Sequence, residues 1–240
     1  MSSILAQRPA LMRSPVWFFD LDNTLHNASH AIFPAVNVNM NRYIARVLEA
    51  KSLPFDADVV NALRYDYWQR YGTTLMGMVR HHQVDPTHFL HEAHAFDDLA
   101  SMVRTERGLL HMLKRLPGRK ILLTNAPQKY ARAMLRELGI TRQFARHVHV
   151  EQMVVHRILR PKPSRSYLRK LLAHEGVSAR RCVLVEDTLV NLKSAKAVGM
   201  RTVWLTQFLA ASYGVARLPS YVDVKVKSVR RLAAAVSRLR

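Results

Sequence analysis

The sequence predicts an α/β protein: a doubly wound, mostly parallel, Rossmann-like sheet with an all-helical segment inserted after the first strand. Residues 16–19 form an apolar run without alternation, which is typical of a strand covered on both faces. From about residue 105 onward, short apolar runs alternate with helical patterns, as expected for right-handed crossovers between parallel strands. Between these two parts, residues 29–104 carry helical spacing and no convincing strand.

A basic arm, residues 1–15, precedes the first strand. The first 19 residues contain no acid, and they include Arg8 and Arg13. They have neither a long apolar centre nor a small-residue cleavage site. A loose arm is therefore favoured over a transit peptide.

Capping residues and periodicity predict the helices of the inserted segment. Apolar residues at helical spacing between Phe33 and Leu48 predict the first helix. Asp56 can cap a second helix, in which Trp68 is expected to pack in the core. The remaining boundaries are a break at Tyr71–Thr74, a short helix over residues 75–81 and a helix start at Asp85-Pro86.

The rest of the chain alternates strands with helices. The basic residues of its last helix are interpreted as a solvated face, in preference to a nucleic-acid or membrane contact. We expect a catalytic core made of residues 16–28 and 105–240, with residues 29–104 as a separate helical domain. The predicted strands are 120–124, 147–150, 181–185, 201–205 and 221–226; the helices are 108–116, 127–138, 164–174 and 189–198, with a last one containing Arg230, Arg231, Arg238 and Arg240.

The charge balance is strongly basic. The 240 residues include 37 Lys and Arg against 17 Asp and Glu, a formal net charge of +20. Such a charge attracts polyanions, so nucleic acid is a possible partner. The basic residues are spread along the chain, however, which favours a generally basic, solvated surface.

Cysteine usage and hydropathy bear on the compartment. Cys182 is the single cysteine, so no internal disulfide can form, as is typical of a reducing compartment. No stretch approaches the roughly 20 apolar residues of a membrane span. We therefore expect a cytoplasmic protein without a membrane partner.

Candidate functional residues follow three predicted strands and one turn. Carboxyl ends of parallel strands meet at one edge of a sheet, where such proteins bind ligands. Polar turn chemistry is the alternative explanation for each pair taken alone. Because four such groups coincide, we expect one crevice lined by Asp20, Asp22, Thr124, Asn125, Glu186 and Asp187, with Lys162 supplied by the proline-flanked turn Arg160–Pro163.

Four carboxylates in one crevice predict a divalent cation. Two unit charges about 4 Å apart repel by roughly 4 kcal/mol at a protein-surface dielectric, and a cation relieves this repulsion. Hard oxygen ligands without a nearby cysteine or patterned histidines indicate Mg²⁺. Histidines do cluster in the helical segment, but they lack a matching carboxylate pattern, so a zinc site there is not favoured.

These residues resemble the motifs of the haloacid dehalogenase-like phosphohydrolases. The first motif matches Asp20–Leu25, the second Thr124-Asn125, the third Lys162-Pro163 and the fourth Val185–Thr188. Order and spacing agree over roughly residues 16–205. The resemblance also implies that residues 29–104, hereafter the cap, correspond to the cap that one subfamily carries between its first two motifs.

The resemblance implies a phosphoaspartyl mechanism. Asp20 would be the nucleophile, and Asp22 would protonate the leaving group and later deprotonate water. Dehalogenases of the superfamily do not have this second aspartate, which favours a phosphatase. Thr124 and Asn125 would bind phosphate, Lys162 would offset its charge, and Asp20, Glu186, Asp187 and the backbone carbonyl of Asp22 would hold Mg²⁺.

Finer features resemble the pyrimidine 5′-nucleotidases. They are Asn23, the cap stretch Tyr71–Thr74, and Glu186–Thr188 with the residues that follow it. The implied substrates are nucleoside 5′-monophosphates, with Tyr71 as a substrate contact, and the protein is expected to be a monomer or homodimer. Ser164-Arg165 depart from the usual third motif. The alternatives are a phosphatase or phosphomutase of sugar phosphates and, in another class, a basic nucleic-acid-binding protein without turnover.

Overall fold

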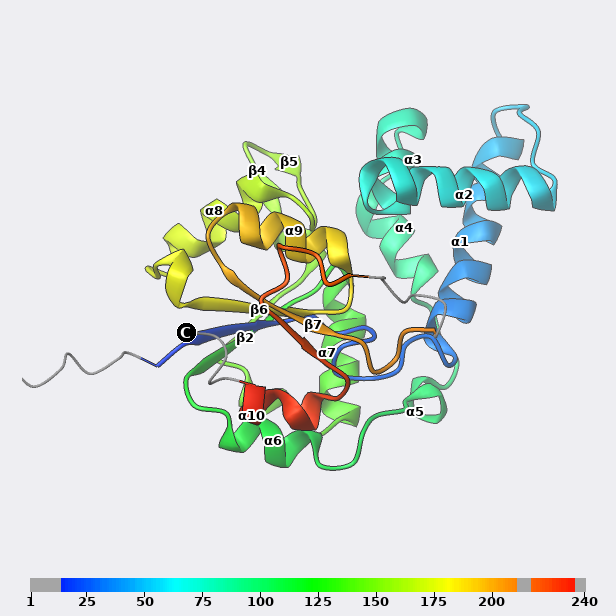
Figure 1. The fold of residues 1–240 in the computed structure, drawn as a ribbon. Coiled ribbons are helices and arrows are strands. Elements are labelled where there is room, and N and C mark those ends of the chain that lie inside the picture. The colour runs from blue at the N-terminus through cyan, green and yellow to red at the C-terminus, as the bar shows by residue number, and fades with distance from the viewer. Residues whose placement is uncertain (1–13, 211–216, 236–240) are drawn as a thin grey trace, which may run out of the picture.

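The fold centres on a six-stranded parallel sheet (Figure 1). The computed structural model describes residues 14–210 and 217–235, so most of the predicted N-terminal arm, and Arg238 and Arg240, lie outside the described residues. The strand order is β3-β2-β1-β6-β7-β8, and every neighbouring pair is parallel. The strands are β1 (Val16–Phe19), β2 (Arg119–Leu123), β3 (Arg146–Val148), β6 (Cys182–Glu186), β7 (Arg201–Leu205) and β8 (Val224–Val226).

Helices cover both faces of this sheet, which confirms the predicted doubly wound α/β class. Side chains alternate along β1, so Trp17 and Phe19 enter one apolar cluster while Val16 and Phe18 enter the other. All four are buried, as expected for a strand without polar alternation. The helices are α6 (Leu109–Arg115), α7 (Gln128–Glu137), α8 (Arg165–His174), α9 (Leu189–Ala197) and α10 (Leu232–Ala235).

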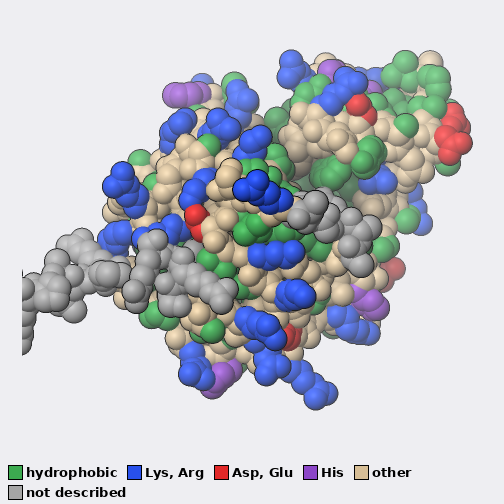
Figure 2. All heavy atoms as spheres, in the orientation of Figure 1, with side chains coloured by type: hydrophobic (Ala, Val, Ile, Leu, Met, Phe, Trp, Pro, Cys, Tyr) green, Lys and Arg blue, Asp and Glu red, His purple; other side chains and the backbone are tan. Residues whose placement is uncertain are grey.

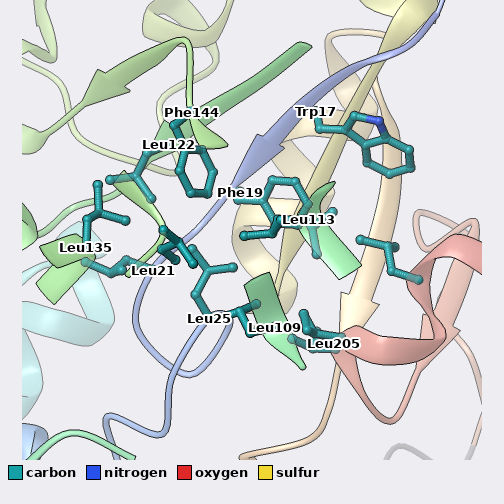
Figure 3. Packing of buried hydrophobic residues seen from close by; sticks show 14 of the residues in the cluster. Trp17, Phe19, Leu21, Leu25, Leu109, Leu113, Leu122, Leu135, Phe144 and Leu205 are labelled. Carbon is teal, nitrogen blue, oxygen red and sulfur yellow. The ribbon is translucent and has the colours of Figure 1, made fainter. Parts of the chain in front are cut away.

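One core cluster fills the space between the sheet and the side covered by α6, α7 and α10 (Figure 3). Phe19 lies at its centre, with its ring 6.0 Å from that of Phe144 in an edge-to-face arrangement. Leu113 and Leu205 are fully buried in the same cluster. Burying side chains of this size contributes about 1.5–3 kcal/mol each, so β1 is fixed from both sides before it reaches Asp20.

The cap has a separate apolar cluster, in which Ile44, Met78 and Phe89 are buried. Figure 1 shows α1 to α4 beside the sheet and not on either of its faces. Asp56 caps its helix as predicted, and a helix starts at Asp85-Pro86 as predicted, with the Asp85 side chain accepting a hydrogen bond from its first turn. The cap helices are α1 (Ile32–Glu49), α2 (Ala57–Tyr71), α3 (Thr74–His82) and α4 (Pro86–Ala93), followed by the short α5 (Leu99–Met102).

Several details differ from the sequence prediction. Trp68 is 43% exposed and its ring lies at a tilted angle beside that of Tyr65 instead of packing in the core, because α2 buries its other face through Val60 and Tyr67. The last strand covers only Val224–Val226 of the predicted 221–226. The prediction also missed a small antiparallel hairpin, β4 (Val154–Val155) with β5 (Ile158–Leu159), and the 3-10 turns Thr141–Gln143, Val150–Gln152, Ala179–Arg181 and Val229–Arg231.

The face of the molecule drawn in Figure 2 is basic without one concentrated block. Figure 2 shows Lys and Arg side chains scattered over the visible face, with few acidic ones among them. This distribution matches the interpretation of a generally basic, solvated surface. Among the described helices, none combines the length and apolarity that a membrane crossing requires.

Candidate active site

Three predicted site residues meet at the carboxyl end of the central strands. Asp20 follows β1, and Glu186 ends the neighbouring β6. The Lys162 ammonium lies between them, 2.7 Å from Asp20 Oδ1 and 2.7 Å from Glu186 Oε2. All three side chains are at least nine-tenths buried. The structure therefore brings together groups that are 142 and 24 residues apart in the sequence.

The sheet topology explains this meeting. Strand β1 pairs with β2 on one side and β6 on the other, with Phe19 opposite both Leu122 and Val185. The backbone N–H of Asp20 then donates to the carbonyl of Val185 at 3.0 Å, which extends the ladder by one residue. Because the strands are parallel and in register, the residues that follow them lie at the same edge of the sheet, as predicted.

Asn125 holds the lysine loop in place. Its side-chain amide donates to the carbonyl of Lys162 at 3.0 Å and accepts from the N–H of Lys162 at 2.9 Å. Because both ends of the amide bind that backbone, the observed contacts of Asn125 are with the protein. A phosphate contact of Asn125 stays a prediction.

Two threonines place hydroxyl groups beside these residues. Thr124 is 1% exposed, and its Oγ1 accepts from the N–H of Ala126 at 3.0 Å, which leaves its hydroxyl proton available to a ligand. Thr24, within the first motif, donates to Asp20 Oδ2 at 3.2 Å, a contact that was not predicted. The hydroxyl four residues after the aspartate in the first motif could have indicated this contact.

A carboxylate cluster at this edge suits a metal ion. Oxygens of Asp20, Glu186 and Asp187 all lie within 4.8 Å of one another, and all three residues are buried. Lys162 offsets only one of their charges if all are ionised. Hard oxygen donors in excess of the local positive charge fit Mg²⁺. Within the described part of the chain, no other group of three or more potential ligands is found.

The repulsion within this cluster raises the pKa values of Asp20 and Asp187. Burial raises the pKa of Asp20 to about 7, and the charge of Glu186 adds to the rise despite the opposing effect of Lys162. Burial, then the charges of Glu186 and Asp20, hold the pKa of Asp187 well above its ordinary value. Burial alone would lower the pKa of Lys162, but Asp20 and Glu186 outweigh it and raise that pKa. These carboxyl groups therefore favour a positive neighbour.

Asp22 lies outside this ionic cluster and has its own partners. The hydroxyl of Tyr130, on α7, donates to Asp22 Oδ1 at 2.6 Å, and Nε2 of His26 lies 2.8 Å from the same oxygen. Burial opposes ionisation of Asp22, but the hydrogen bonds from His26 and Tyr130 and the charges of His26 and His94 together outweigh it, so the pKa of Asp22 is lowered. Neither partner was predicted from the sequence. The spacing of Asp22 and His26 was a local signal, whereas Tyr130 is 108 residues away.

Tyr71 lies where the cap meets the core. It ends α2, and the next residue, Gly72, has a φ of 79°. A Cβ at Gly72 would lie 2.8 Å from Cδ of Pro163, so this turn of the cap touches the loop that carries Lys162. The Tyr71 hydroxyl is 2.7 Å from Nε2 of His81. Tyr71 is therefore one residue from the point where the cap contacts the lysine loop, while a contact of its side chain with substrate stays a prediction.

Three other cap histidines have side-chain contacts within the protein. His82 pairs with the Tyr67 hydroxyl at 2.9 Å, and His88 pairs with that of Tyr43 at 3.0 Å. Nδ1 of His94 lies 3.1 Å from the carbonyl of Leu90, and its ring is 5.2 Å from that of Tyr130. These contacts give His82, His88 and His94 roles in packing and capping.

Comparison with known proteins gives a family match and a distant relative. A family model described as haloacid dehalogenase-like hydrolase matches residues 16–199. Phosphate metabolism protein 8 of Saccharomyces cerevisiae is 24% identical over 198 residues, which is 77% of this chain. The match covers 59% of the yeast protein's length.

Solved structures share the fold. A HAD phosphatase from Thermococcus onnurineus superposes with a TM-score of 0.61 at 15% identity, covering 94% of this chain and 98% of that one. The HAD-hydrolase YfnB from Bacillus subtilis, solved bound to magnesium, gives a TM-score of 0.58 at 14% identity, covering 94% and 99%. At such identities the likeness concerns the fold alone.

Proposed function

The chain belongs to the haloacid dehalogenase-like hydrolases, and from this premise we propose that it is a Mg²⁺-dependent phosphomonoester hydrolase acting through an aspartyl-phosphate intermediate. The observation that carries the proposal is the separation of two carboxyl groups. Asp20 sits in the ionic cluster with Lys162, whereas Asp22 is held outside it by Tyr130 and His26. Covalent catalysis needs such a division between a nucleophile and an acid that supplies a proton.

In the first step, Asp20 attacks phosphorus and the bond to the leaving oxygen breaks. The electron pair of that bond stays with the leaving oxygen, which takes the proton from Asp22 and departs as an alcohol. In the second step, Asp22 removes a proton from water while the water oxygen attacks phosphorus. The bond to Asp20 then breaks, and orthophosphate is released. Each step leaves Asp22 ready for the next. Asp22 would enter the first step protonated, because the negative charge of a bound phosphate ester favours that form against the hydrogen bonds that lower its pKa in the free protein.

The remaining residues neutralise or bind the phosphoryl group. The Lys162 ammonium, already between two carboxylates, would balance the charge that the phosphate brings in, and the Thr124 hydroxyl would donate to a phosphate oxygen. Asp20, Glu186 and Asp187, with the backbone carbonyl of Asp22, would hold Mg²⁺. When bound, the ion would supply positive charge next to the phosphate oxygens.

For the substrate, we favour nucleoside 5′-monophosphates, pyrimidine ones first. Support comes from the resemblance of Asn23 and Tyr71–Thr74 to the pyrimidine 5′-nucleotidases, and from the contact between Gly72 and Pro163, which sets Tyr71 beside the lysine loop. In this proposal residues 16–28 and 105–240 form the catalytic core, and the cap, residues 29–104, excludes water and selects the leaving group.

A phosphatase acting on sugar phosphates or other small phosphomonoesters fits the same residues equally well. Asp20, Lys162 and the carboxylates proposed to hold Mg²⁺ act on the phosphoryl group. None of them distinguishes one leaving group from another. In this proposal the cap residues would do so. The yeast relative's name places that protein in phosphate metabolism, which is compatible with either substrate class.

A substrate panel tests the proposal. Phosphate release is measured for uridine, cytidine and adenosine 5′-monophosphates, hexose phosphates and phosphoglycolate, each with Mg²⁺ and with chelator. We expect Mg²⁺-dependent turnover with the pyrimidine nucleotides ahead. Preference for a sugar phosphate would replace the substrate assignment, and absence of turnover on every ester would overturn the enzymatic proposal. Tight, salt-dependent RNA or DNA binding with negligible turnover would favour the nucleic-acid-binding alternative.

A further inference from the structure

We propose that Tyr130 and His26 are positioning residues that fix the carboxyl group of Asp22 so that its Oδ2 faces the leaving group. This inference rests on the proposed phosphomonoesterase function and adds two residues to it. Neither Tyr130 nor His26 belongs to the four motifs on which the family resemblance rests. Both act through Asp22, without contacting the reacting atoms themselves.

The geometry of the hydrogen bonds distinguishes the two oxygens of Asp22. Tyr130 Oη and His26 Nε2 converge on Oδ1, at 2.6 and 2.8 Å. Because an ionised carboxylate only accepts hydrogen bonds, both partners must act as donors to it. Among the described residues, Oδ2 has no hydrogen-bond partner. One oxygen is therefore anchored, and the other remains available to carry the proton.

The two donors are themselves immobilised by packing. Tyr130 is 3% exposed, and its ring lies 5.2 Å from that of His94 and 5.7 Å from that of Phe96, which follow the last main helix of the cap. His26 is fully buried. The turn that carries His26 is tied to the chain returning from the cap, because Asn27 N–H donates to the carbonyl of Arg104 at 2.7 Å. Rigid donors restrict the rotation of the group they bind.

The restraint matters because no lysine or arginine in the described structure pairs with Asp22. Lys162 binds Asp20 and Glu186, and it has no hydrogen bond with Asp22. The Asp22 side chain is 18% exposed, so it borders solvent at the site. Without Tyr130 and His26, its carboxyl group could turn towards water. Holding a reacting group in a productive orientation is a large part of enzymatic rate enhancement.

This role predicts a dependence on the leaving group. A leaving alkoxide needs the proton from Asp22, whereas p-nitrophenolate departs without one. Loss of the anchors should therefore slow alkyl phosphates and spare p-nitrophenyl phosphate when formation of the intermediate limits the rate. A general collapse of the site would instead slow both esters alike. The ratio of the two rates separates positioning from structure.

The experiment compares Tyr130→Phe, His26→Leu and His26→Gln with the wild type, using single-turnover rates. The substrates are the best alkyl phosphate from the panel and p-nitrophenyl phosphate. General acid catalysis contributes roughly 10²–10⁴-fold, so we expect Tyr130→Phe and His26→Leu to lose about tenfold or more on the alkyl ester and less than about threefold on the aryl ester. His26→Gln keeps an N–H donor and should recover part of the alkyl rate.

Two further variants complete the test. Tyr167→Phe removes another buried tyrosine hydroxyl, on α8, and should change neither rate. Asp22→Asn should show the same selectivity for the aryl ester, and adding Tyr130→Phe to it should cost the alkyl rate little more. Full additivity of the two changes would contradict action through Asp22.

The outcomes separate this inference from the proposed function. Equal losses on both esters, or an unchanged alkyl rate in Tyr130→Phe, would overturn the positioning role while the phosphomonoesterase function stood. A wild-type protein inactive on every ester would instead overturn the proposed function, and the inference with it.

Discussion

Replacing Asp187 by asparagine should stabilise the metal-free protein and abolish its response to Mg²⁺. The side chain is buried beside Asp20 and Glu186, with oxygens of all three within 4.8 Å. Asparagine has nearly the same shape, and its Oδ1 can still accept the hydrogen bond that Thr188 donates to Asp187 at 3.1 Å. The substitution therefore removes a charge with little change in packing.

The magnitude follows from the charge separation. Two unit charges 4.8 Å apart repel by about 3.5 kcal/mol at an effective dielectric constant of about 20. The folded protein avoids part of this cost by binding a proton, since the pKa of Asp187 is well above normal. We expect a net gain of about 1–2 kcal/mol at pH 8, or about 3–6 °C in Tm for a chain of this size.

The gain should depend on pH in a defined direction. Burial, with the nearby charges of Glu186 and Asp20, raises the pKa of Asp187 above its ordinary 3.8, so the folded state binds this proton more tightly than the unfolded state. Stability then falls as the pH rises from about that ordinary value towards the folded-state pKa. The advantage of Asp187→Asn should therefore be larger at pH 8 than at pH 5.

Thermal unfolding with chelator and with Mg²⁺ measures both effects. Mg²⁺ should raise the wild-type Tm by mass action and leave that of Asp187→Asn nearly unchanged. Asp66→Asn is the control, because Asp66 forms an exposed ion pair with Arg70 in the cap, where such pairs contribute about 0–1 kcal/mol. A lower Tm for Asp187→Asn in chelator at pH 8, or a preserved Mg²⁺ shift, would refute the reasoning.

Three other substitutions test separate parts of the site. Asp20→Asn should lower turnover at least about 10³-fold with the circular dichroism spectrum unchanged; residual turnover near wild type would exclude Asp20 as nucleophile. Lys162→Met leaves buried carboxylates unpaired and should cost about 3–5 kcal/mol in urea unfolding, so an unchanged midpoint would contradict the ion-pair account. Gly72→Ala should lower both stability and kcat/KM, because the new Cβ meets Pro163, whereas Gly139→Ala, with nothing within 4 Å, should lower stability only.

The strand ends of the core could be predicted from the sequence because their cause is local and periodic. The apolar run 16–19 has to be covered on both faces, and its parallel neighbours end in register with it. Asp20, Glu186 and Lys162 then converge by topology. Two helices of the cap domain could be predicted for the same reason, because an aspartate that caps a helix N-terminus contacts backbone within one turn of itself.

The parts that the sequence did not reveal depend on long-range packing. Tyr130 was one apolar position among others on its helix, and only the fold brings its hydroxyl to Asp22. Trp68 has the spacing of a core residue, but α2 carries apolar side chains on both faces and buries the other one. The hairpin of β4 and β5 has two residues in each strand, too few to show a period.

The most direct test of the central claim is detection of the phosphoryl group on Asp20. Rapid acid quench during turnover of ³²P-labelled p-nitrophenyl phosphate should label the protein, and peptide mapping should place the label on Asp20. Asp22→Asn should accumulate more label, since removal of a proton from water is slowed, and Asp20→Asn should carry none. Steady turnover with no labelled protein in either the wild type or Asp22→Asn, or label on another residue, would contradict the mechanism.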